Sequence, residues 1–288
     1  MNNIPIPTND NSAALLALAM NPAVASYPNL QVLVAPIQAS YGQYLVVRGN
    51  PFFVQNLTIS ALTSKYLQQY YKSPPADLRF ITELRNSLEH RICPMCGSMH
   101  RGTLDHYLPK NKYPVFSIFS LNLIPACKCN IKRKEILIGP NMGERILHPY
   151  FDACLSERLI TAKFSDLGPV PRVSIQIIVS AQHSNYPVIS FHFREIIEKT
   201  AIGGYLADRW SKLNRKPSLV VRAFDKNHTN PTQLQHVLEI EREKLDDLHG
   251  GKNNWDSVFI SGLLDPVVIA WLAQKFSASG RIADSPLT

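Results

Sequence analysis

Residues 93–110 read CPMCGSMHRGTLDHYLPK and residues 120–134 read SLNLIPACKCNIKRK, and the two stretches hold four of the five cysteines of the 288-residue chain. The four cysteines form two tight pairs. No Lys or Arg precedes the first apolar run of the chain, so a secretory signal is not expected. In a chain that is not exported, such pairs favour a metal site over disulfides. We therefore predict a metal ligand set of Cys93, Cys96, Cys127 and Cys129, and interpret Cys154 as a small core residue.

The side chains between and after the cysteine pairs suit hydrolysis of a phosphodiester bond. His106 can take a proton from water near neutral pH. The Asp105 carboxylate and the Asn130 side-chain carbonyl are oxygen ligands that a hard divalent cation prefers. Asn122 is available to pin the backbone of the loop that carries the histidine. Four basic residues nearby could hold flanking phosphates, namely Lys110, Lys132, Arg133 and Lys134.

The positive charge of the chain is concentrated in the same region. The whole chain carries a formal charge of +8, and residues 61–135 hold 12 Lys and Arg against 5 Asp and Glu, a net charge of +7. A localised basic field attracts polyanions and speeds encounter with them. This distribution favours nucleic acid as the partner, although a basic patch that only aids solubility has the same composition.

The order of these motifs resembles the HNH endonuclease family. The resemblance rests on Cys-Pro-Met-Cys-Gly, Leu-Asp-His-Tyr-Leu-Pro-Lys, Tyr-Pro-Val-Phe-Ser-Ile, Asn-Leu-Ile-Pro-Ala-Cys, Cys-Asn and His-Pro-Tyr-Phe-Asp, and covers residues 78–152. It is closest to the HNH nucleases of bacterial anti-phage defence systems of the Septu type. In those systems the nuclease is encoded beside an ABC-like ATPase, so the resemblance implies such a partner.

The resemblance also implies roles for individual residues. His106 matches the general base, Asp105 and Asn130 match the ligands of a catalytic Mg²⁺ or Mn²⁺, and Asn122 matches the structural amide. The four paired cysteines match the ligands of a structural Zn²⁺. His148 matches the His-Pro-Tyr motif, and a core histidine bonded to backbone is the favoured interpretation of it.

The second cysteine pair departs from the family pattern. The family usually has Cys-x-x-Cys, whereas this chain has Cys127-Lys128-Cys129. One residue deleted from a helix would turn everything after it by about 100°. We expect the turn before the helix to absorb the deletion, because Asn130 and Lys132 keep their places relative to Cys129. His100 is the alternative zinc ligand if Cys129 cannot reach the ion.

The flanking regions are expected to be helical and mixed. Residues 1–30 read as a weakly ordered or partner-docked arm, and residues 30–34 and 44–47 as β-leaning patches. The expected helices are 58–71, 75–90, 191–212, 231–248 and 255–276, the expected strands are 159–164 and 173–181, and the tail from Ser277 is expected to fray. In the second helix, Leu78, Ile81, Leu84, Arg85 and Leu88 recur at helical spacing.

We therefore predict an α+β protein in which a zinc-clamped ββα-metal HNH core is embedded in a larger helical and mixed domain. The predicted regions are an N-terminal arm and helix over 1–72, the nuclease core over 73–152, and a mixed then helical region over 153–288. The predicted function is metal-dependent endonucleolytic cleavage, of DNA more than RNA, in a cytoplasmic protein without a membrane span. The alternative is a non-catalytic, zinc-stabilised module that binds nucleic acid or a partner protein.

Overall fold

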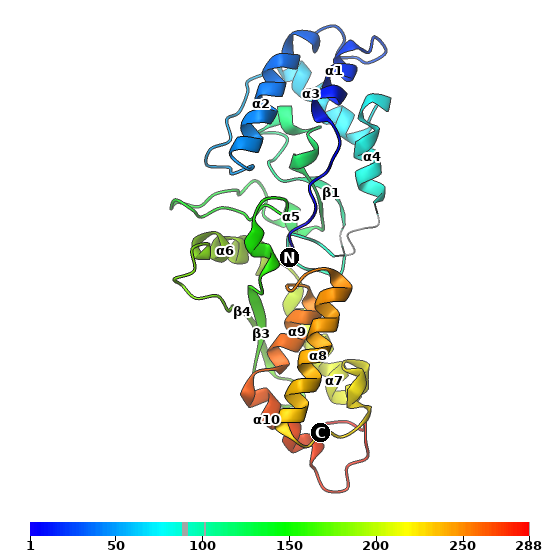
Figure 1. Cartoon of the computed structure of the whole chain (residues 1–288), viewed down its shortest axis with the longest axis vertical. Coiled ribbons are helices and arrows are strands. Elements are labelled where there is room, and N and C mark those ends of the chain that lie inside the picture. Colours follow the sequence, from blue (N-terminus) through cyan, green and yellow to red (C-terminus); the bar gives the residue numbers. More distant parts are fainter. Residues whose placement is uncertain (88–91, 101, 288) are drawn as a thin grey trace.

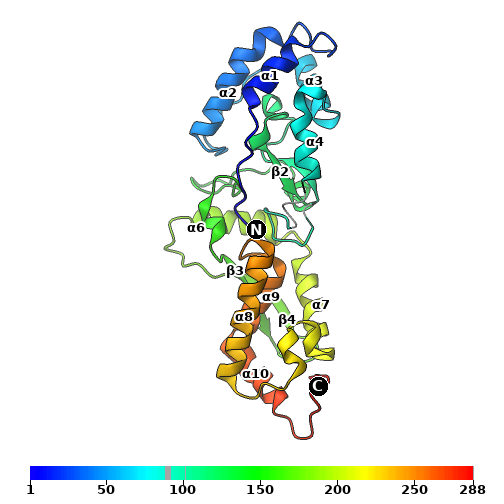
Figure 2. The same cartoon turned by 45° about the vertical axis from the view of Figure 1, so that its right-hand side comes forward.

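The computed structural model describes residues 1–87, 92–100 and 102–287. The molecule is elongated, with the first four helices at one end and the last four at the other (Figure 1). A small sheet and the cysteine pairs lie between the two ends. The N-terminus also lies at this middle level, and a view turned by 45° shows the same arrangement (Figure 2).

The fold is mixed α+β, as predicted, with ten α-helices and two two-stranded sheets among the described residues. The helices are α1 (Asn11–Met20), α2 (Val34–Val46), α3 (Ala61–Lys72), α4 (Arg79–Asn86), α5 (Cys129–Lys132), α6 (Tyr186–His192), α7 (Ile202–Arg215), α8 (Pro231–His249), α9 (Trp255–Leu263) and α10 (Pro266–Phe276). The strands are β1 (Thr103–His106), β2 (Leu123–Ala126), β3 (Ile160–Ser165) and β4 (Arg172–Ile177).

The first 50 residues are more ordered and more helical than predicted. The β-leaning patch at 30–34 is a 3₁₀ turn leading into α2, and the patch at 44–47 is the end of α2. Ile37, Tyr41 and Tyr44 recur at helical spacing and are all buried, so packing of this face overrides the local β-propensity. The prediction of a weakly ordered arm is also wrong, because Met1 and Ile4 are buried and Asp10 caps α1 through the Ser12 and Ala13 N–H groups.

Helix α2 packs on the loop that joins β1 to β2. The ring of Tyr41 stacks on that of Phe119 with 4.2 Å between centroids, and the Tyr44 hydroxyl donates to the Leu121 carbonyl at 3.2 Å. Strands β1 and β2 are antiparallel, with Asp105 opposite Ile124 and His106 opposite Leu123. The loop between these strands is therefore held by a helix that lies outside the motif segment.

The helices of the C-terminal half are shorter than the sequence pattern predicted. The helix expected at 255–276 is two helices, because Pro266 has no N–H to continue α9 and Asp265 caps α10 instead. The helix expected at 191–212 is divided by a π-turn at Phe193–Ile197 and a break before α7. Helix α8 is confirmed, with Asn230 at its N-cap accepting two backbone N–H groups.

The remaining elements agree in part. Helix α3 and strands β3 and β4 lie within a few residues of the predicted ranges, whereas the expected helix at 75–90 is a 3₁₀ turn followed by α4, and its last residues lie outside the described ranges. The expected fraying of the tail is wrong, because Leu287 is 1% exposed and its N–H donates to the Asn214 carbonyl at 2.8 Å. Helix α9 packs directly on β3, where a Cβ at Gly262 would lie 2.7 Å from that of Ala162.

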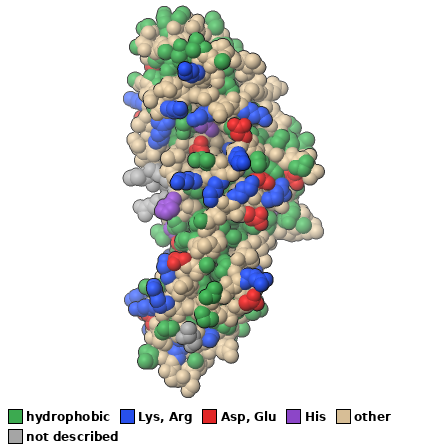
Figure 3. Space-filling model, turned by 180° about the vertical axis from the view of Figure 1, so that it is seen from behind, with side chains coloured by type: hydrophobic (Ala, Val, Ile, Leu, Met, Phe, Trp, Pro, Cys, Tyr) green, Lys and Arg blue, Asp and Glu red, His purple; other side chains and the backbone are tan. Residues whose placement is uncertain are grey.

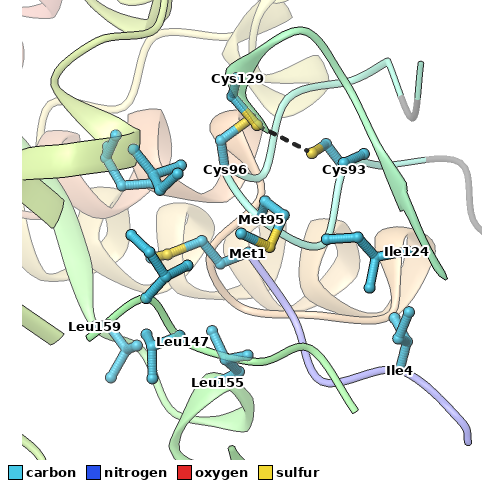
Figure 4. Packing of buried hydrophobic residues seen from close by; sticks show 14 of the residues in the cluster. Met1, Ile4, Cys93, Met95, Cys96, Ile124, Cys129, Leu147, Leu155 and Leu159 are labelled. Atoms are coloured by element: carbon cyan, nitrogen blue, oxygen red, sulfur yellow. Dashed lines mark hydrogen bonds between the residues drawn. The ribbon is translucent and has the colours of Figure 1, made fainter. Parts of the chain in front are cut away.

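The first cysteine pair is docked on the C-terminal half. The Trp255 indole donates to the Cys96 carbonyl at 2.8 Å, and the Trp255 N–H donates to the Gly97 carbonyl at 3.1 Å. Gly97 has φ +77°, and a Cβ there would lie 2.0 Å from the Asn253 carbonyl oxygen. Glycine is therefore required where the two halves meet. Figure 4 shows Met1 and Met95 packed beside the cysteines at this junction.

No helix in the described ranges is both long and apolar enough to cross a membrane. Helices α9 and α10 reach that length and apolar composition only together, and the pair is bent by 75°.

Asn253 lies where the two halves meet, and we expect the loss of its side chain to destabilise the protein. Its side chain is fully buried, accepts the Leu159 N–H at 2.7 Å and donates to the Glu157 carbonyl at 2.7 Å. Asn253→Ala removes both bonds and leaves the buried Leu159 N–H without this partner, which should lower the free energy of unfolding by about 1–3 kcal/mol. Urea denaturation measures the change, with the exposed Asn141→Ala as control. Equal midpoints for the two variants would contradict this role.

Candidate metal centre and basic pocket

The four paired cysteines converge on one point. Their sulfur atoms all lie within 4.8 Å of one another, with 3.6 Å between those of Cys93 and Cys129 and 3.4 Å between those of Cys96 and Cys127. A tetrahedral zinc ion with Zn–S bonds of about 2.3 Å needs sulfur atoms about 3.8 Å apart. The set is closed, with three of the four cysteines buried, as in a structural site. The cluster therefore fits zinc.

The short Cys-x-Cys spacing still lets both cysteines reach the cluster. Helix α5 begins at Cys129, so Cys127 and Lys128 precede the helix and Cys129 is its first residue. The Cys129 N–H donates to the Cys127 sulfur at 3.4 Å, and the Cys127 N–H donates to the Cys93 sulfur at 3.3 Å. Cys129 thus reaches the cluster, and the exposed His100 is not needed as a ligand.

His106 lies at the end of β1 in a fixed tautomer. Its Nε2 lies 2.9 Å from the Ser117 carbonyl oxygen, which can only accept, so Nε2 carries the proton and Nδ1 the lone pair. Nδ1 lies 4.0 Å from Asp105 Oδ1. Burial lowers the pKa of His106 to about 4, so the imidazole is neutral near pH 7. A neutral ring with a free Nδ1 beside a carboxylate can accept a proton from a water molecule.

Asn122 holds the loop that supplies the Ser117 carbonyl. Its Oδ1 accepts the Leu108 N–H at 2.7 Å, and its Nδ2 donates to the Leu108 and Phe116 carbonyls, both at 3.1 Å. The side chain is fully buried. These bonds join both ends of the segment from Leu108 to Ser117 and thereby orient the His106 ring.

Asn130 and Arg133 form a second buried network beneath His106. Asn130 Nδ2 donates to Asp105 Oδ2 at 2.8 Å and to the His106 carbonyl at 3.0 Å, while Oδ1 accepts from Arg133 Nε at 2.7 Å. Arg133 also donates to the carbonyls of Tyr107 and Ile136 and is 1% exposed. The guanidinium is thus enclosed and bonded within the protein, and a contact of Arg133 with phosphate stays a prediction.

A pocket of about 340 Å³ opens above this network. Its lining includes Asp105, His106, Asn130 and three of the predicted phosphate contacts, namely Lys110, Arg133 and Lys134. Lys132 is not part of this lining and donates to the Lys199 carbonyl at 3.1 Å instead. Figure 3 shows Lys and Arg side chains gathered in a band across the middle of one face of the molecule.

Two residues beside His106 were not predicted as part of the site. The Tyr71 ring, at the end of α3, packs edge-on against the His106 ring with 4.2 Å between centroids. Arg85, on α4, lies over the Tyr71 ring at 4.8 Å from its centroid. The only sequence signal was the position of Arg85 among the apolar residues of its helix, which indicates a side chain that faces the protein.

His148 is a core histidine, in line with the favoured interpretation. It is fully buried, with Nε2 2.9 Å from the Tyr44 hydroxyl and Nδ1 accepting the Tyr150 N–H at 3.2 Å. The ring packs on that of Tyr107 with 4.1 Å between centroids. Its neighbours are thus the side chains and backbone that support the motif, rather than the pocket.

Comparison with curated proteins finds one relative encoded by a virus. A stretch of 125 residues is 32% identical to protein Ea31 of Escherichia phage lambda, covering 40% of this chain and 42% of Ea31. The match spans about two fifths of the length of that relative, whose name states no activity. No protein-family model and no solved structure matches the chain.

The cysteine cluster leads to a prediction about metal content. We expect the purified protein to contain one zinc ion per chain by elemental mass spectrometry, and Cys127→Ser to lose it because a tetrahedral site needs all four ligands. Cys154→Ser is the matched control, since Cys154 lies outside the cluster. Wild-type zinc content in Cys127→Ser would exclude the four-cysteine site.

The buried histidines predict a loss of stability in acid. Burial lowers the pKa of His148 to about 3 and that of His192 to about 4, from an ordinary value of 6.5. Below pH 6.5 the unfolded chain binds protons that the folded protein excludes. The free energy of unfolding should therefore keep its full value above pH 6.5 and decrease as the pH is lowered toward 4. Each histidine lowers it by at most about 1.4 kcal/mol per pH unit.

His192→Gln tests this expectation by urea denaturation between pH 7.5 and 4.5. Glutamine can keep the bonds to the Leu147 N–H and the Met95 carbonyl but does not titrate, so the pH dependence should become shallower. The exposed His236→Gln should keep the wild-type dependence. A slope unchanged by His192→Gln would show that this histidine does not carry the effect.

Proposed function

We propose that this protein is a metal-dependent HNH endonuclease that hydrolyses phosphodiester bonds in nucleic acid, with DNA favoured over RNA. The observation that carries the proposal is His106, whose neutral ring is locked in one tautomer with Nδ1 beside Asp105 in a basic pocket. Support also comes from the arrangement around it, since β1 and β2 form a hairpin between the cysteine pairs and the short helix α5 begins at the last cysteine.

In the proposed reaction, His106 Nδ1 accepts a proton from a water molecule, and the resulting hydroxide attacks the phosphorus in line with the leaving 3′ oxygen. Ser117 keeps the other ring nitrogen protonated, and Asn122 keeps Ser117 in place. Lys110 and Lys134 line the pocket and would hold the phosphates that flank the scissile bond.

A divalent cation, Mg²⁺ or Mn²⁺, would supply charge neutralisation of the phosphate and the leaving oxygen. The Asp105 carboxylate fits this ion, because its side chain is 28% exposed and borders the pocket. Asn130 fits it only if the amide turns, since Oδ1 faces Arg133 and Nδ2 faces Asp105. Asp105 and Asn130 would therefore bind the ion jointly only after the Asn130 amide turns and gives up its present bonds to Arg133 and Asp105.

The orientation of Asn130 also favours a second candidate, a zinc-stabilised module that binds nucleic acid without cutting it. In such a module the bonds from Asn130 to Asp105 and Arg133 would be permanent and purely structural. The ABC-like ATPase partner and the role in anti-phage defence remain predictions from the family resemblance. Exposed apolar side chains at the end of α2 and beyond it, Leu45, Val46 and Phe53, offer a surface for a partner protein.

Cleavage of supercoiled plasmid and of total RNA tests the proposal. We expect wild-type protein to nick or cut the plasmid with Mg²⁺ or Mn²⁺ and not in EDTA. His106→Ala should lower the rate by roughly 10²–10⁴-fold through loss of the base. His100→Ala is the matched control, because His100 is exposed and outside the pocket lining. Equal cutting by His106→Ala and wild type would exclude this mechanism, and plasmid bound in EDTA but left intact with Mg²⁺ would favour the module.

A further inference from the structure

Helices α3 and α4 form a wall beside His106 that the proposed mechanism does not use. Tyr71 ends α3 with its ring 4.2 Å from that of His106, and its hydroxyl donates to the Leu104 carbonyl of β1. The wall is thus attached to the strand that carries Asp105 and His106. These helices lie outside the motif segment, so their residues add to the surroundings of His106 from another part of the chain.

Two cations lie on the Tyr71 ring. The Arg85 guanidinium lies 4.8 Å and the Lys110 ammonium 4.9 Å from the ring centroid. Arg85 is oriented further by donating to the Tyr71 and Lys72 carbonyls at the C-terminus of α3. An aromatic face holds cations at a defined place while leaving part of their hydrogen-bonding capacity free for a ligand.

The cations in this cluster repel one another. The pKa of Lys110 is lowered first by burial and then by the charge of Lys72, with Arg85 acting in the same direction and Asp105 opposing them. Within residues 1–87, 92–100 and 102–287, Lys72, Arg85 and Lys110 form no ion pair with an acidic side chain. In the part of the chain that the structure describes, this concentration of positive charge has no ion-paired carboxylate, so it is complementary to an anionic ligand.

We propose that Arg85 and Lys72 form, with Lys110, a second phosphate-binding subsite beside His106, for which Tyr71 positions the cations. The ligand class is the sugar–phosphate backbone of DNA, a choice that rests on the proposed function. Lys110 and Lys134 line the pocket, whereas Lys72 ends α3 and Arg85 lies on α4 beside it. The DNA strand therefore crosses His106 between the helical wall and the end of α5.

Binding of a fluorescein-labelled 30-base-pair duplex to the full chain, followed by anisotropy in EDTA, tests this subsite separately from cleavage. We expect Arg85→Gln and Lys72→Gln each to raise Kd by about 10-fold. Each should also reduce the slope of log K against log salt by about 0.9, the value for one lost phosphate contact. Lys72 is exposed, so its variant does not depend on refolding of the wall.

Arg79→Gln is the matched control, because Arg79 lies on the same helix but is 84% exposed and paired with Glu83 at 3.5 Å. It should leave Kd and the salt slope unchanged. We expect Tyr71→Leu to weaken binding of the duplex, whereas Tyr71→Phe, which keeps the ring, should bind it as tightly as the wild type. Equal binding by Tyr71→Leu and Tyr71→Phe would overturn its positioning role.

Wild-type Kd and salt slope in both Arg85→Gln and Lys72→Gln would overturn the subsite even if the protein cuts DNA. Absence of duplex binding by the wild type would overturn it as well. Conversely, weakened binding in both variants, with no metal-dependent cutting by any of them, would support the subsite while rejecting the nuclease. The two proposals therefore fail in different measurements.

Discussion

The convergence of four cysteine sulfurs is the constraint on which the rest of the structure depends. Cys93 and Cys96 precede β1, and Cys127 and Cys129 follow β2, so the cluster closes the hairpin at its base. A two-stranded hairpin is marginal in water by itself, and a metal ion bound by this cluster would supply stability that the strands lack. The Trp255 indole donates to the Cys96 carbonyl and thereby connects this small unit to the C-terminal helices.

The side chains of the motif residues serve first as hydrogen-bond partners for backbone groups that lie outside the sheet. The chain after His106 leaves the sheet, and its buried carbonyls and N–H groups need bonds that no strand supplies. Asn122 serves Leu108 and Phe116, while Asn130 and Arg133 serve His106 and Tyr107. This is why Arg133 is enclosed: its planar set of donors can satisfy several converging carbonyls at once. Lys134, one residue later, is left exposed at the pocket.

The pocket is lined by the motif segment, and a helical wall packs beside its histidine. β1 supplies Asp105 and His106, whereas α3 and α4 supply the aromatic ring and the cations beside them. Because Tyr71 is bonded to Leu104 and packed on His106, the wall and the strand form one continuous unit. Positive charge from both sources thus surrounds a neutral histidine, an arrangement that combines a base with sites for an anion.

The sequence by itself determined the residues with unusual chemistry: the two cysteine pairs, Asp105 with His106, and the amides Asn122 and Asn130. These positions could be predicted because their side chains are costly in a core unless they bond or bind something. Helix α8 was equally predictable, since Asn230 and Pro231 specify its start locally. Helix α2 was not, because β-branched and aromatic residues in it are stabilised by packing on Phe116 and Phe119. The burial of Arg133 and the approach of Tyr71 and Arg85 to His106 were decided only by the tertiary structure, because solvent exposure and contacts between distant segments depend on how the whole chain packs.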